Sequence, residues 1–258
     1  MTPRLIYAAF MLAALAIFLL ARRVLRSTGG LSKLSPMERL VLGLAAFVGG
    51  TFGARLPFVF HYGSEGLTIG AWLADGKTIT TGLIGAYLGV ELVKAAIGIR
   101  VKTGDDFAIP LALALAVGRW GCFFNGCCFG TPTDLPWGVD FGDGLRRHPT
   151  QIYESLFHAF LAGLLIVVVR RGWLKQQRLK FYLIAYFGYR FLSEFIRPEP
   201  DGLLGLTFYQ WVSVGAILLL AVQWWWDSRA RAITTGSPSR CEIIDSSDPH
   251  RSSFDSAS

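Results

Sequence analysis

Seven long apolar segments make up most of this 258-residue chain and constrain its fold more than any other feature. A helix needs about 20 apolar residues to cross the hydrocarbon core of a bilayer, with a range of about 17–25. Most segments meet this length, although the first and sixth are slightly short and the sixth carries charge. They cover residues 5–20, 40–60, 81–99, 107–124, 151–169, 181–196 and 204–226.

This pattern predicts an all-α, polytopic integral membrane protein with about seven transmembrane helices over residues 1–232. Only 17% of the residues are charged, against about 25% in a soluble domain. The first segment is expected to be a span rather than a signal peptide, because Ala21-Arg-Arg is a poor cleavage site. Residues 233–258 are rich in Ser and Asp and predict a disordered cytoplasmic tail. We expect a monomer in contact with membrane lipids.

Basic residues gather in alternate connections between the segments, which the positive-inside rule places in the cytoplasm. The N-terminus is then outside and the C-terminus inside the bacterial plasma (inner) membrane. The other connections, residues 61–80, 125–149 and 197–205, predict an outward-facing loop or head region. The net charge of +7 forms no basic face, so nucleic acid is not expected as a partner. The basic residues are Arg22, Arg23, Arg26, Lys33, Arg39, Lys94, Arg100, Lys102, Arg170, Arg171, Lys175, Arg178, Lys180, Arg229 and Arg231.

Arg55, Arg119, Arg190 and Glu194 are charged residues inside predicted spans, where charge is costly and usually functional. From the rise of a helix, Arg55 lies roughly 22 Å and Arg119 roughly 20 Å along its span. Arg190 lies roughly 15 Å and Glu194 roughly 21 Å along theirs. The hydrocarbon core is about 30 Å thick, so all four are expected at or beyond the midplane, in the outward half.

The sixth segment carries a polar stripe. Tyr186, Arg190, Glu194 and Arg197 follow one another at spacings of four, four and three residues, so they share one helix face. These charges could simply pair to hold helices together. Alternatively, the excess of arginine suits an anionic lipid head group, since guanidinium groups bind phosphate through two hydrogen bonds.

Three motifs are more specific than the charges. They are Gly118-Arg-Trp-Gly-Cys-Phe-Phe-Asn-Gly-Cys-Cys-Phe-Gly130, Arg147-His-Pro-Thr-Gln-Ile-Tyr-Glu154 and Tyr186-Phe-Gly-Tyr-Arg-Phe-Leu-Ser-Glu-Phe-Ile-Arg197. In this order, and with Gly53-Ala-Arg-Leu56, they resemble the prolipoprotein diacylglyceryl transferase family over about residues 40–220. The resemblance implies an enzyme that transfers the diacylglyceryl group of phosphatidylglycerol to the lipobox cysteine thiol in the signal peptide of an exported prolipoprotein. Glycerol phosphate is released, and no metal or organic cofactor is implied.

The resemblance also implies site residues, on the outer-leaflet side of the membrane. Arg119 and Arg190 would bind the phosphate, with Glu194 and Tyr186 orienting them. The wider substrate-binding set is Arg55, Arg119, Asn125, Gly130, Gln151, Tyr153, Arg190 and Arg197. The family's usual His-Gly-Gly is Thr80-Thr81-Gly82 here, so the usual histidine base is missing. His148 or Glu154 is the hypothesised substitute.

Two family positions, commonly Asn and Glu, are Cys122 and Cys127 in this chain. With Cys128, these cysteines are compatible with a disulfide, with packed thiols, and less readily with a reactive thiol or a metal site. The substitutions also leave open a paralogue of the same fold with another acceptor. A non-enzymatic binder or transporter of anionic lipid is the alternative of a different class, although no repeated halves support it. His158 is expected to be a helix-packing residue.

Overall fold

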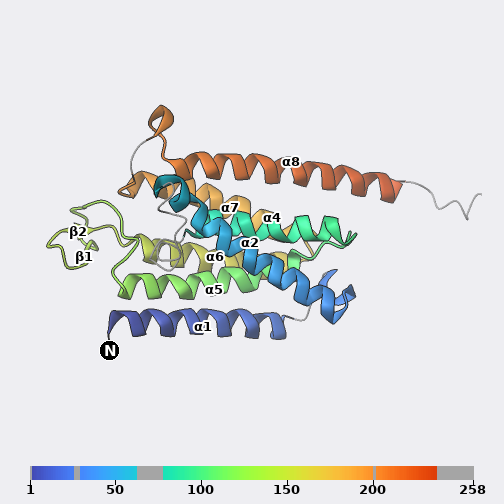
Figure 1. The fold of residues 1–258 in the computed structure, drawn as a ribbon, viewed down its shortest axis with the longest axis horizontal. Helices are drawn as coiled ribbons and strands as arrows, with labels where there is room; N and C mark the ends of the chain where they lie inside the picture. Colours follow the sequence, from blue (N-terminus) through green and yellow to red (C-terminus); the bar gives the residue numbers. More distant parts are fainter. Residues whose placement is uncertain (1, 26–29, 63–77, 200–201, 237–258) are drawn as a thin grey trace, which may run out of the picture. The chain divides into compact units, whose positions relative to one another are not determined.

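The computed structural model describes residues 2–25, 30–62, 78–199 and 202–236, and this part of the chain is all-α with seven α-helices. Figure 1 shows them in sequence colours. The helices are α1 (Pro3–Val24), α2 (Pro36–Tyr62), α4 (Ile79–Ala96), α5 (Asp105–Phe124), α6 (Thr150–Arg170), α7 (Arg178–Ser193) and α8 (Phe208–Gly236). Short elements join them: η1 (Gly30–Lys33), β1 (Val139–Asp140), β2 (Arg146–Arg147), η3 (Glu194–Ile196) and η4 (Leu203–Gly205).

Six of these helices are long and apolar enough to cross a membrane. The exception is α7, which has 16 residues and carries the polar stripe. The predicted all-α, multi-spanning fold is therefore confirmed, together with the short, charged character of the sixth segment. Helix α8 runs to Gly236, past the expected boundary at residue 232, while the expected tail from 237 onward lies outside the described residues.

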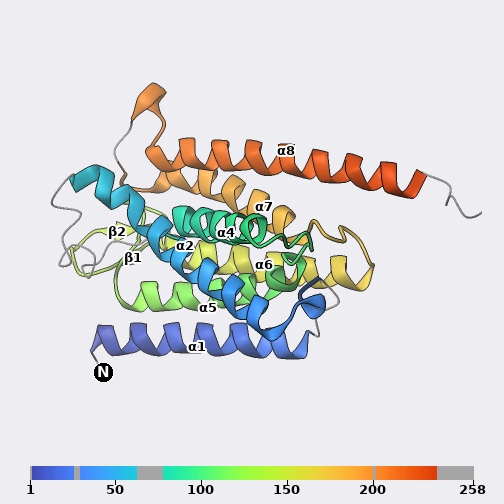
Figure 2. The ribbon, with the colours of Figure 1, turned by 45° about the vertical axis from the view of Figure 1, so that its right-hand side comes forward.

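The chain divides into two compact units, Met1–Leu218 and Leu219–Ser258. Within the first unit, α1 packs on α5, α5 packs on α6, and α2 packs on α4. Figures 1 and 2 both show the β1–β2 hairpin at the end of this unit where α1 begins. The two strands are antiparallel, with Val139 opposite Arg147. The N-terminus and the connection between α5 and α6 therefore lie on one side, as the predicted topology requires.

Burial is inverted relative to a soluble protein. Large apolar side chains face outward, with Leu12 68%, Phe47 72% and Phe160 70% exposed. Polar side chains such as Gln151 and Glu154 are fully buried. This distribution fits a lipid environment, because polar groups in hydrocarbon must find partners inside the protein.

Glycines let α2 and α4 approach to backbone contact. Gly49 and Gly53 on α2 face Gly85 and Gly89 on α4, and each pair has the four-residue spacing of close-packed membrane helices. A Cβ atom added to Gly49 would clash with the carbonyl oxygen of Gly85. This contact fixes the start of α4, where Thr80 is buried.

Gly49→Ala is expected to lower the free energy of unfolding by about 1–3 kcal/mol, because the backbones of α2 and α4 must separate. Gly43→Ala in the same helix is the matched control, since its Cβ would meet nothing within 4 Å. The control should leave stability unchanged or raise it by up to about 1 kcal/mol. Thermal unfolding of both variants in detergent provides the measurement; equal melting temperatures would show that the close approach is not required.

Candidate functional site: a buried cluster of arginines and carboxylates

Glu154 is the centre of a buried ionic network formed by three helices. It lies in the second turn of α6 and is fully buried. Its Oε1 accepts hydrogen bonds from Arg119 Nη2 of α5 at 2.5 Å and from the Tyr186 hydroxyl of α7 at 3.0 Å. Its Oε2 accepts one from Arg197 Nη2 at 3.3 Å. One carboxylate thus joins α5, α6, α7 and the turn after α7.

The helix pattern explains why Glu154 points inward. Gln151, Glu154, Ser155 and His158 follow one another at helical spacing and are all buried, so they form one polar face of α6. The Ser155 hydroxyl donates to the carbonyl of Ala116 at 2.7 Å, which fixes this face against α5. The register of the two helices then brings Arg119 to Glu154.

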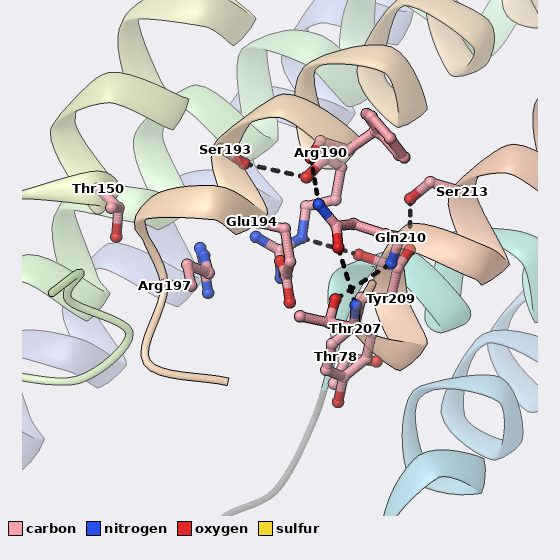
Figure 3. Close-up of polar contacts among 12 residues, drawn as sticks. Thr78, Thr150, Arg190, Ser193, Glu194, Arg197, Thr207, Tyr209, Gln210 and Ser213 are labelled. Carbon is pink, nitrogen blue, oxygen red and sulfur yellow. Dashed lines mark hydrogen bonds and ion pairs between the residues drawn. The ribbon is translucent and has the colours of Figure 1, made fainter. Parts of the chain in front are cut away.

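A second ionic pair joins the last turn of α7 to the first residue of η3. Arg190 Nη2 lies 2.8 Å from Glu194 Oε2, and Arg190 Nε donates to the Thr80 hydroxyl of α4 at 3.1 Å. Figure 3 shows Arg190 and Glu194 together, with Gln210 and Thr207 from the start of α8 nearby. The Gln210 amide donates to the carbonyl of Phe191 at 3.3 Å, so the start of α8 contacts the same end of α7.

The predicted polar stripe is present only in part, because α7 ends at Ser193, Glu194 begins η3 and Arg197 has an extended backbone. Its contacts also differ in part from those expected. Glu194 contacts Arg190, the partner that the sequence predicts for it. Tyr186 bonds to Glu154 rather than to an arginine. The partner of Arg119 is Glu154, which the sequence reasoning had treated as a possible base and had not counted among the membrane charges.

The cluster carries an excess of positive charge and of hydrogen-bond donors. Three arginines (119, 190 and 197) face two carboxylates (154 and 194), which leaves one net positive charge. Three of their buried N–H groups have no partner in the described part of the chain: Arg119 Nε, Arg190 Nη1 and Arg197 Nε. Burial, followed by the charge of Arg190, lowers the pKa of Arg197. An oxyanion would supply both the missing charge and the missing acceptors.

The Asn125–Tyr153 region packs beside this cluster. Gly130 N–H donates to the carbonyl of His148 at 2.9 Å, and a Cβ on Gly130 would lie 2.5 Å from the carbonyl oxygen of Ile196. Only glycine therefore lets this loop pass against the turn after α7. His148 Nδ1 lies 3.4 Å from the Tyr153 hydroxyl, which also accepts from Trp137 Nε1 at 2.8 Å.

The other predicted binding residues lie on the neighbouring loop and helices. Gln151 donates to the carbonyl of Cys127 at 2.6 Å and so supports the loop. Asn125 directly follows the last residue of α5 and is exposed. Arg55 is buried on α2. In the described residues, no ionic contact joins His148 to Glu154.

Cys122, Cys127 and Cys128 are free thiols that converge at the end of α5. Their sulfur atoms all lie within 4.8 Å of one another, and Arg119 Nη1 lies 3.9 Å from the sulfur of Cys122. Hydrogen bonds with Cys122 and Cys127, and the charge of Arg119, lower the pKa of Cys128.

Two groups of the site were missed by the sequence reasoning. Thr80, at the position of the missing histidine, binds Arg190 through its hydroxyl. His158 packs between helices as expected, but its Nε2 also lies 3.8 Å from Glu154 and its Nδ1 lies 3.0 Å from the Tyr182 hydroxyl. The spacing of four residues from Glu154 was the available signal for His158. No sequence signal was available for Thr80, because its partner Arg190 lies 110 residues away.

The fold and the site define a multi-spanning membrane protein with a buried cluster of arginines and carboxylates at one end of its helices. The family model for prolipoprotein diacylglyceryl transferase matches residues 5–226. The chain belongs to this family of membrane-bound transferases, which confirms the resemblance drawn from the motifs.

Curated relatives support the same assignment, and each is named phosphatidylglycerol–prolipoprotein diacylglyceryl transferase. The relative from Bordetella avium is 35% identical over 225 residues, covering 81% of this chain and 84% of the relative. That from Methylococcus capsulatus is 34% identical over 227 residues, covering 82% and 83%. That from Clostridium tetani is 31% identical over 189 residues, covering 69% and 76%.

Tyr186→Phe is expected to lower the free energy of unfolding by about 1–2 kcal/mol, because it removes a hydroxyl bonded to a buried carboxylate. Tyr189→Phe on the same helix is the matched control. The Tyr189 ring stacks on Phe157 at 4.3 Å, and its hydroxyl has no partner in the described part of the chain. Denaturation in detergent compares the two, and a loss of stability no larger for Tyr186→Phe than for the control would contradict the role assigned to the hydroxyl.

Proposed function

We propose that this chain transfers the diacylglyceryl group of phosphatidylglycerol to the lipobox cysteine thiol of exported prolipoproteins and releases glycerol phosphate. The observation that carries the proposal is the buried arginine cluster, with one unbalanced positive charge and three unpartnered N–H donors. A phosphodiester has one negative charge and several acceptor oxygens, so it fits this deficit. Family membership and the names of the relatives support the same substrates.

The bond changes assign roles to these residues. The substrate thiol attacks the glycerol carbon that bears the phosphate, a C–S bond forms, and the C–O bond breaks. Glycerol phosphate leaves with the electron pair of that bond, so negative charge grows on the departing oxygen. Arg119 and Arg190 bind the phosphate and stabilise this charge. Fixed donors are effective here because they need no rearrangement during the reaction.

The carboxylates act as positioning residues in this scheme. Glu154 holds Arg119 and Arg197, and Tyr186 holds Glu154. Glu194 and Thr80 both hold Arg190. Asn125, Gly130, Gln151 and Tyr153 shape the adjoining loop, on which the acceptor peptide is expected to lie.

The thiol proton needs an acceptor, and the two candidates differ in their surroundings. Both oxygens of Glu154 already accept hydrogen bonds from Arg119, Tyr186 and Arg197. The ring of His148 bears a longer contact, with the Tyr153 hydroxyl at 3.4 Å. His148 is therefore the base that we favour.

The orientation follows from the basic connections together with the position of the hairpin. The proposed location is the bacterial plasma membrane, with the N-terminus and the β1–β2 hairpin outside and the C-terminus in the cytoplasm. Arg119, Glu154 and Arg190 all lie in the hairpin-side half of their helices. This arrangement would expose the site to lipids of the outer leaflet and to exported acceptors, and we propose that a monomer is sufficient.

Arg119→Ala and Arg190→Ala are each expected to reduce kcat/KM by about 10²–10³-fold, the usual loss when one donor to a developing oxyanion is removed. The assay mixes purified protein with labelled phosphatidylglycerol and a lipobox peptide, and measures both glycerol phosphate release and peptide lipidation. His148→Gln in the same assay tests the base, and full activity of that variant would remove His148 from the mechanism.

Arg170→Ala is the matched control for charge, because Arg170 is exposed at the opposite end of α6. It should retain wild-type kcat/KM. Lipid binding by the intact protein without release of glycerol phosphate would contradict the transferase proposal and favour a non-enzymatic lipid binder. Release of glycerol phosphate without lipidation of the peptide would indicate a different acceptor.

Alkaline phosphatase fused after Asp134 is expected to be active in cells, because this enzyme folds only outside the cytoplasm and Asp134 precedes the hairpin. The same reporter fused after Lys175, between α6 and α7, should be inactive. Phosphatase activity of whole cells, corrected for the amount of fusion protein, is the measurement. The reverse pattern would overturn the proposed orientation.

A further inference from the structure

Three cysteines form a cluster that the transfer reaction does not use. The spacing Cys-x4-Cys-Cys does not predict a metal site, since paired ligand spacings are the usual signature. In the structure, however, the chain folds back after α5, and the sulfur atoms of Cys122, Cys127 and Cys128 come within 4.8 Å of one another. Metal–sulfur bonds of about 2.3 Å place the sulfurs of a three-thiolate site about 4 Å apart. The observed separations therefore need little adjustment.

The backbone of this turn is fixed by contacts outside the thiols. The Cys127 N–H donates to the carbonyl of Cys122 at 3.2 Å. Side chains from the first turn of α6 bind the next two carbonyls: Gln151 Nε2 lies 2.6 Å from the oxygen of Cys127, and the Thr150 hydroxyl lies 2.6 Å from that of Cys128. The backbone that carries the thiols is thus held in place before any ligand binds.

Cys128 shows that this turn is under constraint. Its φ is +64°, and that of Gly126 is +65°. A positive φ is uncommon for a residue with a Cβ atom and persists only where the surroundings enforce it. Here it directs the third thiol toward the other two. Cys128 is also exposed, which gives a solvated ion access to the cluster.

The electrostatic setting suits a divalent ion. Binding M²⁺ forms three S–M bonds and releases three thiol protons to solvent, so the product carries one negative charge. The guanidinium of Arg119, 3.9 Å from the sulfur of Cys122, lies where it compensates that charge. Thiolate ligands select soft or borderline ions such as Zn²⁺ over Mg²⁺ or Ca²⁺.

We propose that Cys122, Cys127 and Cys128 form a three-thiolate site for a thiophilic divalent cation of the Zn²⁺ class, with a fourth coordination position open to water. The three thiols take no part in lipid transfer, although Arg119 lies beside both sites. The proposal is tested by metal binding alone, whether or not the chain transfers diacylglyceryl groups.

The test uses the full chain, purified in detergent under reductant with any affinity tag removed. Zn²⁺ is added, excess ion is removed on a chelating resin, and bound metal is counted by atomic emission. We expect one Zn²⁺ per chain and, with Cd²⁺ as the probe, a thiolate-to-cadmium absorption band in the ultraviolet. Cys127→Ser should weaken binding at least tenfold. Cys241→Ser, which removes the fourth cysteine of the sequence, should bind as the native chain does.

A second measurement avoids variants that fail to fold. Native chain with and without Zn²⁺ is alkylated, and the modified cysteines are identified by mass spectrometry. Protection of Cys122, Cys127 and Cys128, with Cys241 still reactive, supports the site. Equal alkylation of all four cysteines in both samples overturns it, as does a disulfide between two of the three in protein purified without reductant. Equal Zn²⁺ binding by Cys127→Ser and native chain also overturns it.

Discussion

The rest of the site depends on one buried carboxylate. Glu154 is out of contact with water, and an isolated charge there would cost several kcal/mol. Arg119 and Arg197 offset this cost, and Tyr186 supplies a third hydrogen bond. The same contacts also stabilise the arginines, because they hold two guanidinium groups in a region where charge is otherwise excluded. Neither the arginines nor the glutamate would be stable at this position alone.

Each helix around this network contributes a different contact to it. α5 and α6 are joined by the Ser155–Ala116 hydrogen bond, and α7 adds both Tyr186 and Arg190. α4 reaches Arg190 only through Thr80, and the glycine contact between α2 and α4 fixes where Thr80 lies. Arg190 thus contacts an acidic group of η3, which directly follows its own helix, and a hydroxyl from a distant helix. In the proposed reaction, these two independently supported arginines bind a single phosphate.

Much of this arrangement could be predicted from sequence, because it follows from periodic patterns. The spans follow from apolar length, and the common face of Tyr186, Arg190 and Glu194 follows from helical spacing. The partners across helices could not be predicted in this way. Arg119 and Glu154 are 35 residues apart, and their meeting depends on the register of α5 against α6. The convergence of the cysteines likewise depends on a left-handed backbone at Cys128, which no pattern of residue types indicates.

The turn that holds the cysteines also has an evolutionary consequence. Thr150 and Gln151 bind backbone carbonyls, which every amino acid possesses, rather than the side chains of Cys127 and Cys128. The shape of the turn therefore does not depend on which side chains Cys127 and Cys128 carry. Residues at such positions can be substituted while the neighbouring ionic network stays intact. Glu154 differs from this turn, because three partners share its one carboxylate. None of the three can be substituted without affecting the others. The ionic network around Glu154 can thus stay unchanged while side chains a few residues away are substituted.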